Sequence, residues 1–382
     1  MLSIDQLGKF LSQDPGNAEL ACQLADLLFS TGDYDQARTT LQGLPDGSRS
    51  DAGVQFRQAR LDLVAGRYAE AEQRLLLMLR SGHDSGAVGH DIAFSQLCQR
   101  RLTDADQSAQ DTIVRHGATP ELQVLKARIA LMERDYERAQ RALDAALSLE
   151  PDNATALGLR ALGLLDAGET LAADGAAAAC LARYPGQHEA LLAAGTLRLW
   201  QGDAAAAHSH FQRALERFPN SGRALSGMGQ VIMLGGDLEQ AQALLQRAVT
   251  AMPDHIGTWH ALGWTQLLQG ELAEAERSYR NAYALDRNFA ESHGGLAVVL
   301  LLDGRTDEGE IHMKRALKLD SQCISGRYAR TLWLRERGEQ AESDAEFMEL
   351  ARAGALPGLD PSQAHTLAER LRARATAKRG SV

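Results

Sequence analysis

Residues 256–289 contain the pattern that decides the fold: IGTWHALGWTQLLQGELAEAERSYRNAYALDRNF. Gly270, in the middle of this stretch, marks a position that returns every 34 residues through almost the whole chain. Steps of 34 in both directions reach ten positions, and eight of them are glycine although only 35 of the 382 residues are glycine. A fixed period of this length indicates a stack of repeated structural units. The ten positions are Gly32, Gly66, Arg100, Arg134, Gly168, Gly202, Gly236, Gly270, Gly304 and Gly338.

Two further positions of the repeat hold only small residues, and a third is bulky in most units. Because a larger side chain would hold two crossing helices apart, the small positions predict close helix contacts. The first small position is Ala37, Ala71, Ala105, Ala139, Ala173, Ala207, Ala241, Ala275, Gly309 and Ser343, and the second is Ala25, Ala59, Ala93, Ala127, Ala161, Gly195, Gly229, Gly263, Ala297 and Thr331. The bulky position is Leu41, Leu75, Leu143, Phe211, Leu245, Tyr279, Met313 and Phe347, with Ala109 and Ala177 as its weak members.

Each unit is predicted to be a helix, a tight turn and a second helix. Apolar residues in 238–248 recur at three- and four-residue spacing, as on one face of a helix. Glycine before this segment accepts the left-handed backbone that ends a helix, and an acidic residue such as Asp237 caps the next one. Arg100 and Arg134 occupy the same turn position, so we expect a left-handed backbone there too. Prolines such as Pro253 then end the second helix.

These features resemble the tetratricopeptide repeat (TPR) family. Residues 256–289 match the family pattern at Trp259, Leu262, Gly263, Gly270, Leu272, Ala275, Tyr279 and Ala282. The resemblance implies an all-α fold, a right-handed superhelical solenoid of about ten helix-turn-helix repeats. In the family register the units begin at Ala18, Ala52, Gly86, Pro120, Ala154, His188, Gly222, Ile256, Ala290 and Ile324.

The two ends of the chain are predicted to cap the array. Residues 1–17 fit the second half of a repeat and predict an N-terminal capping helix, and residues 18–357 hold the ten repeats. Residues 358–382 predict a C-terminal capping helix, with Ala364, Leu367, Ala368 and Leu371 on one face, and a basic tail. The alanine-rich stretch 172–182 in the middle is read either as a closely packed helix or as a hinge.

Composition restricts the partners and the compartment. The formal charge of −10 argues against binding to nucleic acid or to an anionic membrane. The sequence contains neither a signal-peptide pattern nor an apolar run long enough for a membrane span, so we expect a cytoplasmic protein. The four cysteines lie far apart in sequence, and disulfides between them are not expected in a linear stack. The oligomeric state has no signal in the sequence.

The sequence contains no recognisable catalytic constellation, metal site or cofactor motif, so we expect no enzyme and no cofactor. His188-Glu189 begins a zinc-binding pattern, but Leu192 stands where the second histidine is required. His208 and His210 lie two residues apart, on different faces of a helix. The repeats run to Pro357, and the 25 residues that follow are too few for a catalytic domain.

The family resemblance places the first helix of each unit on the inner, concave surface. Aromatic and arginine side chains there are the best candidates for partner contacts, because such residues dominate binding hot spots. The leucine found at the twelfth position of most units is interpreted instead as a core residue between helices. Arg60 and Arg128 either contact an acidic segment of a partner or remain solvated. The candidate partner-binding residues are Phe56, Arg60, Phe94, Arg128, Trp200, His260, Trp264 and Tyr328.

The leading functional hypothesis is a non-enzymatic scaffold or adaptor, such as a co-chaperone or assembly factor, that binds a peptide or helix in its groove. The alternative is an accessory or regulatory subunit of an enzyme complex, for example in bacterial envelope or polysaccharide biogenesis. The sequence does not distinguish these two hypotheses.

Overall fold

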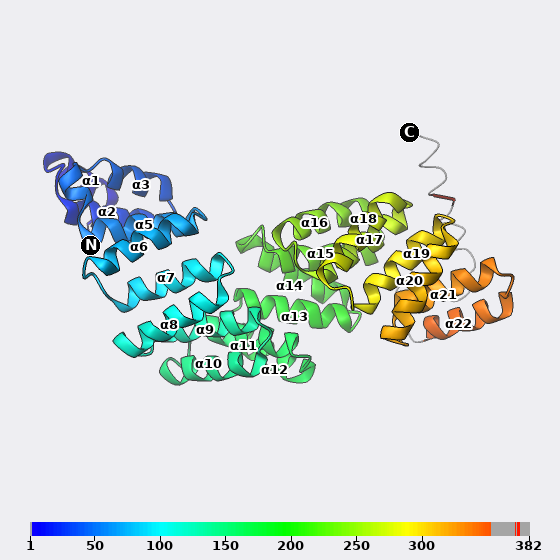
Figure 1. Ribbon diagram of the computed structural model, residues 1–382. Helices are drawn as coiled ribbons and strands as arrows, with labels where there is room; N and C mark the ends of the chain where they lie inside the picture. Colours follow the sequence, from blue (N-terminus) through cyan, green and yellow to red (C-terminus); the bar gives the residue numbers. More distant parts are fainter. Residues whose placement is uncertain (1, 353–370, 372, 375–382) are drawn as a thin grey trace. The chain divides into compact units, whose positions relative to one another are not determined.

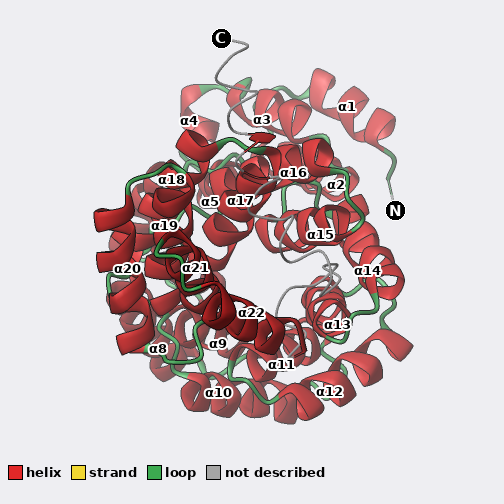
Figure 2. Cartoon of the chain, turned by 90° about the vertical axis from the view of Figure 1, so that its right-hand side faces the viewer, coloured by secondary structure: helices red, strands yellow, loops and turns green. Residues whose placement is uncertain are grey.

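The computed structural model describes residues 2–352, 371, 373 and 374, and every regular element among these residues is an α-helix (Figures 1 and 2). The all-α prediction is therefore confirmed. First and second helices alternate along the chain and are joined by tight turns. A short helix, α1 (Ile4–Gln13), precedes the first pair, and its Leu7 is buried against α2. A single extra turn of helix, α4 (Asp46–Arg49), follows Pro45 and was not expected from the repeat pattern.

The first helices begin at the ten residues from which the 34-residue units were counted. They are α2 (Ala18–Thr31), α5 (Ala52–Val64), α7 (Gly86–Cys98), α9 (Pro120–Met132), α11 (Ala154–Asp166), α13 (His188–Trp200), α15 (Gly222–Leu234), α17 (Ile256–Gln269), α19 (Ala290–Leu302) and α21 (Ile324–Glu336). The second helices are α3 (Tyr34–Gln42), α6 (Tyr68–Arg80), α8 (Leu102–His116), α10 (Tyr136–Leu149), α12 (Thr170–Arg183), α14 (Ala204–Arg217), α16 (Leu238–Ala251), α18 (Leu272–Leu285), α20 (Thr306–Leu319) and α22 (Gln340–Arg352).

The turns between paired helices have the left-handed backbone that the glycine pattern predicts. The eight glycines of the turn position have φ between 74° and 90°, and Arg100 and Arg134 have φ of 60° and 61°. Asp203 and Asp237 then cap the following helices, because each side chain accepts a hydrogen bond from a backbone N–H of the first turn. Glu271 stands at the same place without such a bond, as its longer side chain is a poorer cap.

Close contacts between helices explain why some small positions are glycine and others alanine. The ring of Phe211 in α14 lies between α13 and α15, where a Cβ added at Gly195 or Gly227 would come within 2.8 Å or 2.2 Å of it. Tyr279 of α18 packs in the same way, and a Cβ at Gly295 would lie 2.3 Å from its ring. Three units with leucine at the bulky position have alanine instead, but Gly229 faces Leu245, whose Cγ would lie 2.7 Å from an added Cβ.

The chain divides into two compact units, Met1–Cys180 and Leu181–Val382. The boundary falls inside α12, within the alanine-rich stretch 172–182. Each unit has its own buried clusters, and the largest in the second unit joins residues of α17 to α22 with Leu371. Whether the stretch acts as a hinge stays a prediction, as does the division into segments 1–17, 18–357 and 358–382. Of the predicted C-terminal cap, Ala364, Leu367 and Ala368 lie outside the described residues.

Candidate partner-binding site

The face formed by the first helices, which we call the first-helix face, is exposed in one part of the chain and covered in another. The ninth residue of each first helix reports this best. It is exposed in α2 and α5, half-buried in α7, α9, α13, α15 and α17, and buried in α11, where it is Leu162. In α19 and α21 the ninth residues, Val298 and Leu332, are buried. The candidate site residues therefore lie in two different environments.

In the first unit, α2 and α5 form a small pocket around an arginine and two phenylalanines. The guanidinium of Arg60 lies over both rings, 5.3 Å from the centroid of Phe29 and 5.9 Å from that of Phe56. Arg57 closes one side through an ion pair with Asp26, with 2.5 Å between nitrogen and oxygen. The cavity has a volume of about 320 Å³. The Arg60 side chain stays 52% exposed, so its charge faces solvent beside an apolar wall.

A buried carboxylate on α7 lies near the arginine of this pocket. Asp91 lies 3.9 Å from Arg60, measured between Oδ2 and Nε, and its Oδ1 lies 2.9 Å from Nδ1 of His90. The His90 ring is stacked parallel to Phe94, with 6.4 Å between the ring centroids. The structure thus groups Phe56, Arg60 and Phe94 on neighbouring helices. In the repeat register these three residues occupy inner-surface positions of successive units, and their role as partner contacts stays a prediction.

Sequence reasoning left Phe29 and Asp91 out of the candidate set, although both shape this pocket. Phe29 occupies the twelfth position, where leucine is usual, and was assigned with that position to the core. An aromatic residue at a position where other units have leucine was the feature of the sequence that could have indicated Phe29. Asp91 lies outside the register of inner positions and gave no signal.

Arg128 and Trp200 lie apart from this pocket. Arg128 is half-buried on α9, one repeat beyond Phe94. Its positive charge lowers the pKa of the Cys98 thiol, but burial has the larger effect, so that pKa is raised. Trp200 is the last residue of α13 and is 63% exposed. Each offers a separate contact point on its own first helix.

In the second unit, His260, Trp264 and Tyr328 belong to a largely buried aromatic group. The His260 ring packs edge-on against Tyr279 and Phe289, and its Nε2 lies 2.9 Å from the Ser292 hydroxyl. Burial lowers the pKa of His260 to about 4, so the imidazole is neutral at physiological pH. Trp264 is half-buried and lies edge-on to Tyr328, with 6.2 Å between ring centroids.

Tyr328 requires a correction to the predicted set. It is only 2% exposed and belongs to the buried cluster of the second unit, so it presents no surface to a partner in this structure. The register placed it correctly on the inner side of α21, but other residues cover that side. Tyr328 is therefore a core residue here.

The described residues hold no group of three or more histidine, cysteine or acidic side chains placed to bind a metal ion. None of their helices combines the length and the hydropathy that a membrane-spanning segment needs.

A stack of helix pairs with a first-helix face defines the chain as a helical repeat protein. Models of the tetratricopeptide repeat match residues 4–55 and 198–263, and a second such model matches residues 260–322. The chain therefore contains tetratricopeptide repeats.

Solved structures with the same fold are distant in sequence. The chain resembles one in the crystal structure of the APC/C hetero-tetramer Cut9–Hcn1 with 17% identity and a TM-score of 0.67, over 87% of this chain and 67% of that one. It resembles human IFIT1, in a dimer with m7Gppp-AAAA, with 17% identity and a TM-score of 0.55, over 96% of this chain and 93% of that one. At these identities the likeness shows the fold alone. No curated protein matches the chain significantly.

Proposed function

We propose that this protein is a non-enzymatic scaffold or adaptor that binds a segment of a partner protein on its first-helix face. Tetratricopeptide repeats are protein-interaction modules, which supports the general class. One observation carries the proposal beyond that class. Arg60 is exposed, is held over Phe29 and Phe56, and faces an open pocket. Arginine and aromatic side chains in such an arrangement are typical of binding hot spots.

The pocket favours a partner segment with an acidic residue next to an apolar one. A carboxylate would pair with the Arg60 guanidinium, and an apolar side chain would fill the space between the rings. Because Asp91 already lies 3.9 Å from Arg60, the partner's carboxylate must approach from the solvent side. The remaining candidates would offer further contact points within each unit: Phe94 and Arg128 in the first, and Trp200 and Trp264 in the second.

Such a scaffold would serve as a co-chaperone or as an assembly factor. The alternative is an accessory or regulatory subunit of an enzyme complex, for example in bacterial envelope or polysaccharide biogenesis. The two roles differ in what is recovered with the protein: a folding or assembly machine in the first case, a stoichiometric enzyme in the second. Cytoplasmic location and the absence of enzymatic activity and cofactor remain part of the proposal.

We also propose that the chain binds no nucleic acid. The net charge of −10 supports this, because nucleic-acid binding depends on neutralising phosphates. The IFIT1 structures contain m7Gppp-AAAA, so this oligonucleotide is the appropriate probe. Titration of the full chain with it should show no binding at physiological salt, and saturable binding there would overturn this part of the proposal.

Affinity purification with quantitative mass spectrometry from cells that express the protein natively tests the proposed function. Full-length Arg60→Glu and Phe56→Ala should each lower recovery of the specific partner at least about ten-fold, because each removes a hot-spot group. Trp200→Ala and Trp264→Ala test the extended face in the same way. Arg141→Glu is the matched control, since Arg141 is exposed on the second helix α10.

The proposal fails if no protein is recovered above background, or if Arg60→Glu and Phe56→Ala leave recovery unchanged. Thermal unfolding of each variant shows whether a loss of recovery reflects a loss of folding instead.

A further inference from the structure

In the second unit the first-helix face is partly open on α13 and α15 and buried on α19. Every residue of α19 from Ser292 to Leu302 is buried, so this helix is covered on all sides. The thirteenth residue makes the comparison clear. Val64, Trp200 and Leu234 occupy that position in α5, α13 and α15 and are 41% to 63% exposed, whereas Leu302 in α19 is 7% exposed.

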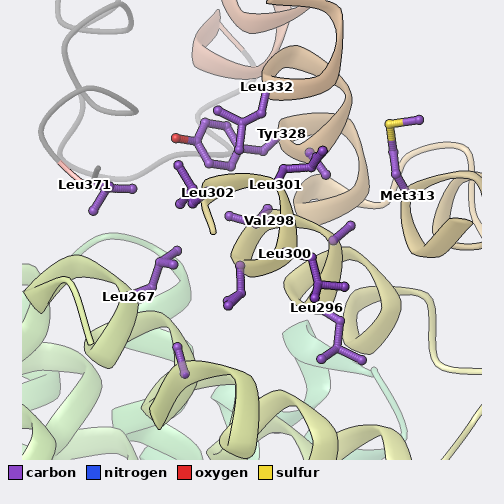
Figure 3. Packing of buried hydrophobic residues seen from close by; sticks show 14 of the residues in the cluster. Leu267, Leu296, Val298, Leu300, Leu301, Leu302, Met313, Tyr328, Leu332 and Leu371 are labelled. Carbon is purple, nitrogen blue, oxygen red and sulfur yellow. The ribbon is translucent and has the colours of Figure 1, made fainter. Parts of the chain in front are cut away.

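The residue that covers this face comes from the C-terminal segment of the same chain. Leu371 is 1% exposed and belongs to the same buried cluster as Leu302 and Tyr328. Figure 3 shows Leu371 beside Leu302, with Tyr328 and Leu332 on one side and Leu267 on the other. These residues come from α17, α19 and α21, so Leu371 lies on the first-helix face of three successive units.

A polar contact fixes the same segment three residues later. Arg374 donates a hydrogen bond of 2.5 Å from Nη1 to the carbonyl oxygen of Leu268, in the last turn of α17. The last four carbonyls of a helix have no partner within that helix, and the helix dipole makes them attractive to a cation. Leu371 and Arg374 are both helical and lie three residues apart, so they point from one side of a helix.

The contacts of Leu371 and Arg374 are not confined to the last helix pair. A cap would cover the outward side of the last pair, α21 and α22, alone. Leu371 and Arg374 instead reach back to α17, two repeats earlier, where a peptide ligand of such a repeat array would lie.

We propose that Leu371 and Arg374 act as an internal ligand on the first-helix face of α17, α19 and α21, and that they must leave before a partner binds there. The ligand that fits this face is an amphipathic helix in which a basic residue follows a leucine after three residues. That a partner protein competes for this face rests on the proposed function. That Leu371 and Arg374 occupy the face does not rest on it. A partner helix of this kind would gain access by displacing Leu371 and Arg374.

The test uses the full chain and a fluorescently labelled synthetic peptide with the sequence of residues 360–380. In the wild-type chain the internal segment competes with the peptide at high effective concentration. Full-length Leu371→Asp should free the face and bind the labelled peptide about ten-fold or more tightly than wild type does. A peptide that itself carries the Leu371→Asp change should not bind either chain.

Two matched variants show where the peptide binds. Added to the Leu371→Asp chain, Leu302→Ala should weaken peptide binding, whereas Leu234→Ala, at the same position of α15, should not. Circular dichroism and thermal unfolding confirm that each chain is folded.

Equal peptide affinity of the wild-type and Leu371→Asp chains would overturn the proposal, as would equal effects of Leu302→Ala and Leu234→Ala. Light scattering of the wild-type chain shows whether the segment is exchanged between two copies, and a dimer that disappears in Leu371→Asp would overturn occupancy within one chain. If the peptide behaves as expected but affinity purification recovers no partner, the internal ligand stands and the proposed function fails.

Discussion

Arg100 and Arg134 show how strongly the repeat constrains a single residue. Both stand where the other eight turns have glycine, and both adopt the left-handed backbone with φ near 60°. This conformation costs a non-glycine residue about 1–2 kcal/mol. The repeat geometry therefore decides the backbone conformation even where the residue type opposes it.

Arg134→Gly should leave the stability unchanged or raise it by up to about 1 kcal/mol. The substitution relieves the left-handed strain, but glycine loses about 0.5–1 kcal/mol more entropy on folding. Chemical denaturation of the full chain measures the difference. Arg141→Gly, in the interior of α10, is the control and should cost about 1 kcal/mol. A clear loss of stability in Arg134→Gly would contradict the strain assigned to this turn.

His260 should make the second unit less stable in acid. Its pKa in the folded state is about 4, below the ordinary value of 6.5, so the folded protein holds the neutral form. Above pH 6.5 the residue is neutral in both states and adds no pH dependence. As the pH falls from 6.5 towards 4, the unfolded chain gains a proton that the folded chain does not, which costs at most about 3 kcal/mol.

His260→Gln should therefore flatten the fall in stability between pH 6.5 and 4, as followed by tryptophan fluorescence in urea at a series of pH values. His83→Gln, at an exposed position, is the control and should leave the profile unchanged. A profile for His260→Gln that is parallel to wild type over this range would contradict the assignment.

At the scale of helices, much of the structure follows from the sequence pattern. The period placed the starts of the first helices and the close contacts at Gly195 and Gly263, because both depend on residues within one repeat or the next. The pairing of Phe211 with two glycines was not predicted, since it depends on the size of a side chain in a third helix.

Gly295→Ala should destabilise the second unit by about 1–3 kcal/mol, because its Cβ would lie 2.3 Å from the Tyr279 ring. The double variant with Tyr279→Leu should lose less than the sum of the two single changes, since the smaller side chain leaves room for the methyl group. Gly8→Ala in α1 has open space around its Cβ and should stabilise by about 1 kcal/mol. Additive losses in the double variant would contradict the packing argument.

The candidate site could be predicted only in part. The register assigned Phe56, Arg60 and Phe94 to first helices of neighbouring units, because their positions recur with the repeat. It did not reveal that Tyr328 is buried in a cluster that includes Leu371, which follows the last repeat and has no place in the 34-residue pattern. Contacts made by a segment outside the period leave no periodic signal.

For the whole molecule, the division inside α12 predicts two separable unfolding transitions. Repeats contact only their neighbours, so we expect each unit to unfold by itself. The four tryptophans, Trp200, Trp259, Trp264 and Trp333, all lie in the second unit. Tryptophan fluorescence therefore reports on the second unit, while circular dichroism reports on both.

Leu75 is fully buried in the first unit, so Leu75→Ala should lower the free energy of unfolding of that unit by about 2–5 kcal/mol. The circular dichroism transition of the first unit should move to lower urea concentration, while the tryptophan fluorescence transition of the second unit should not move. Urea unfolding monitored by both signals measures this. An equal shift of the fluorescence transition would mean that the two units unfold together.

The central claim is that the first-helix face contacts a partner protein, and site-specific photo-crosslinking in cells that express the protein natively tests it most directly. A photoreactive phenylalanine analogue replaces Phe56 in the first helix α5 or, as a matched control, the exposed Leu77 in the second helix α6. We expect a covalent adduct with another protein from position 56 and none from position 77. An adduct from position 77 without one from position 56 would contradict the claim.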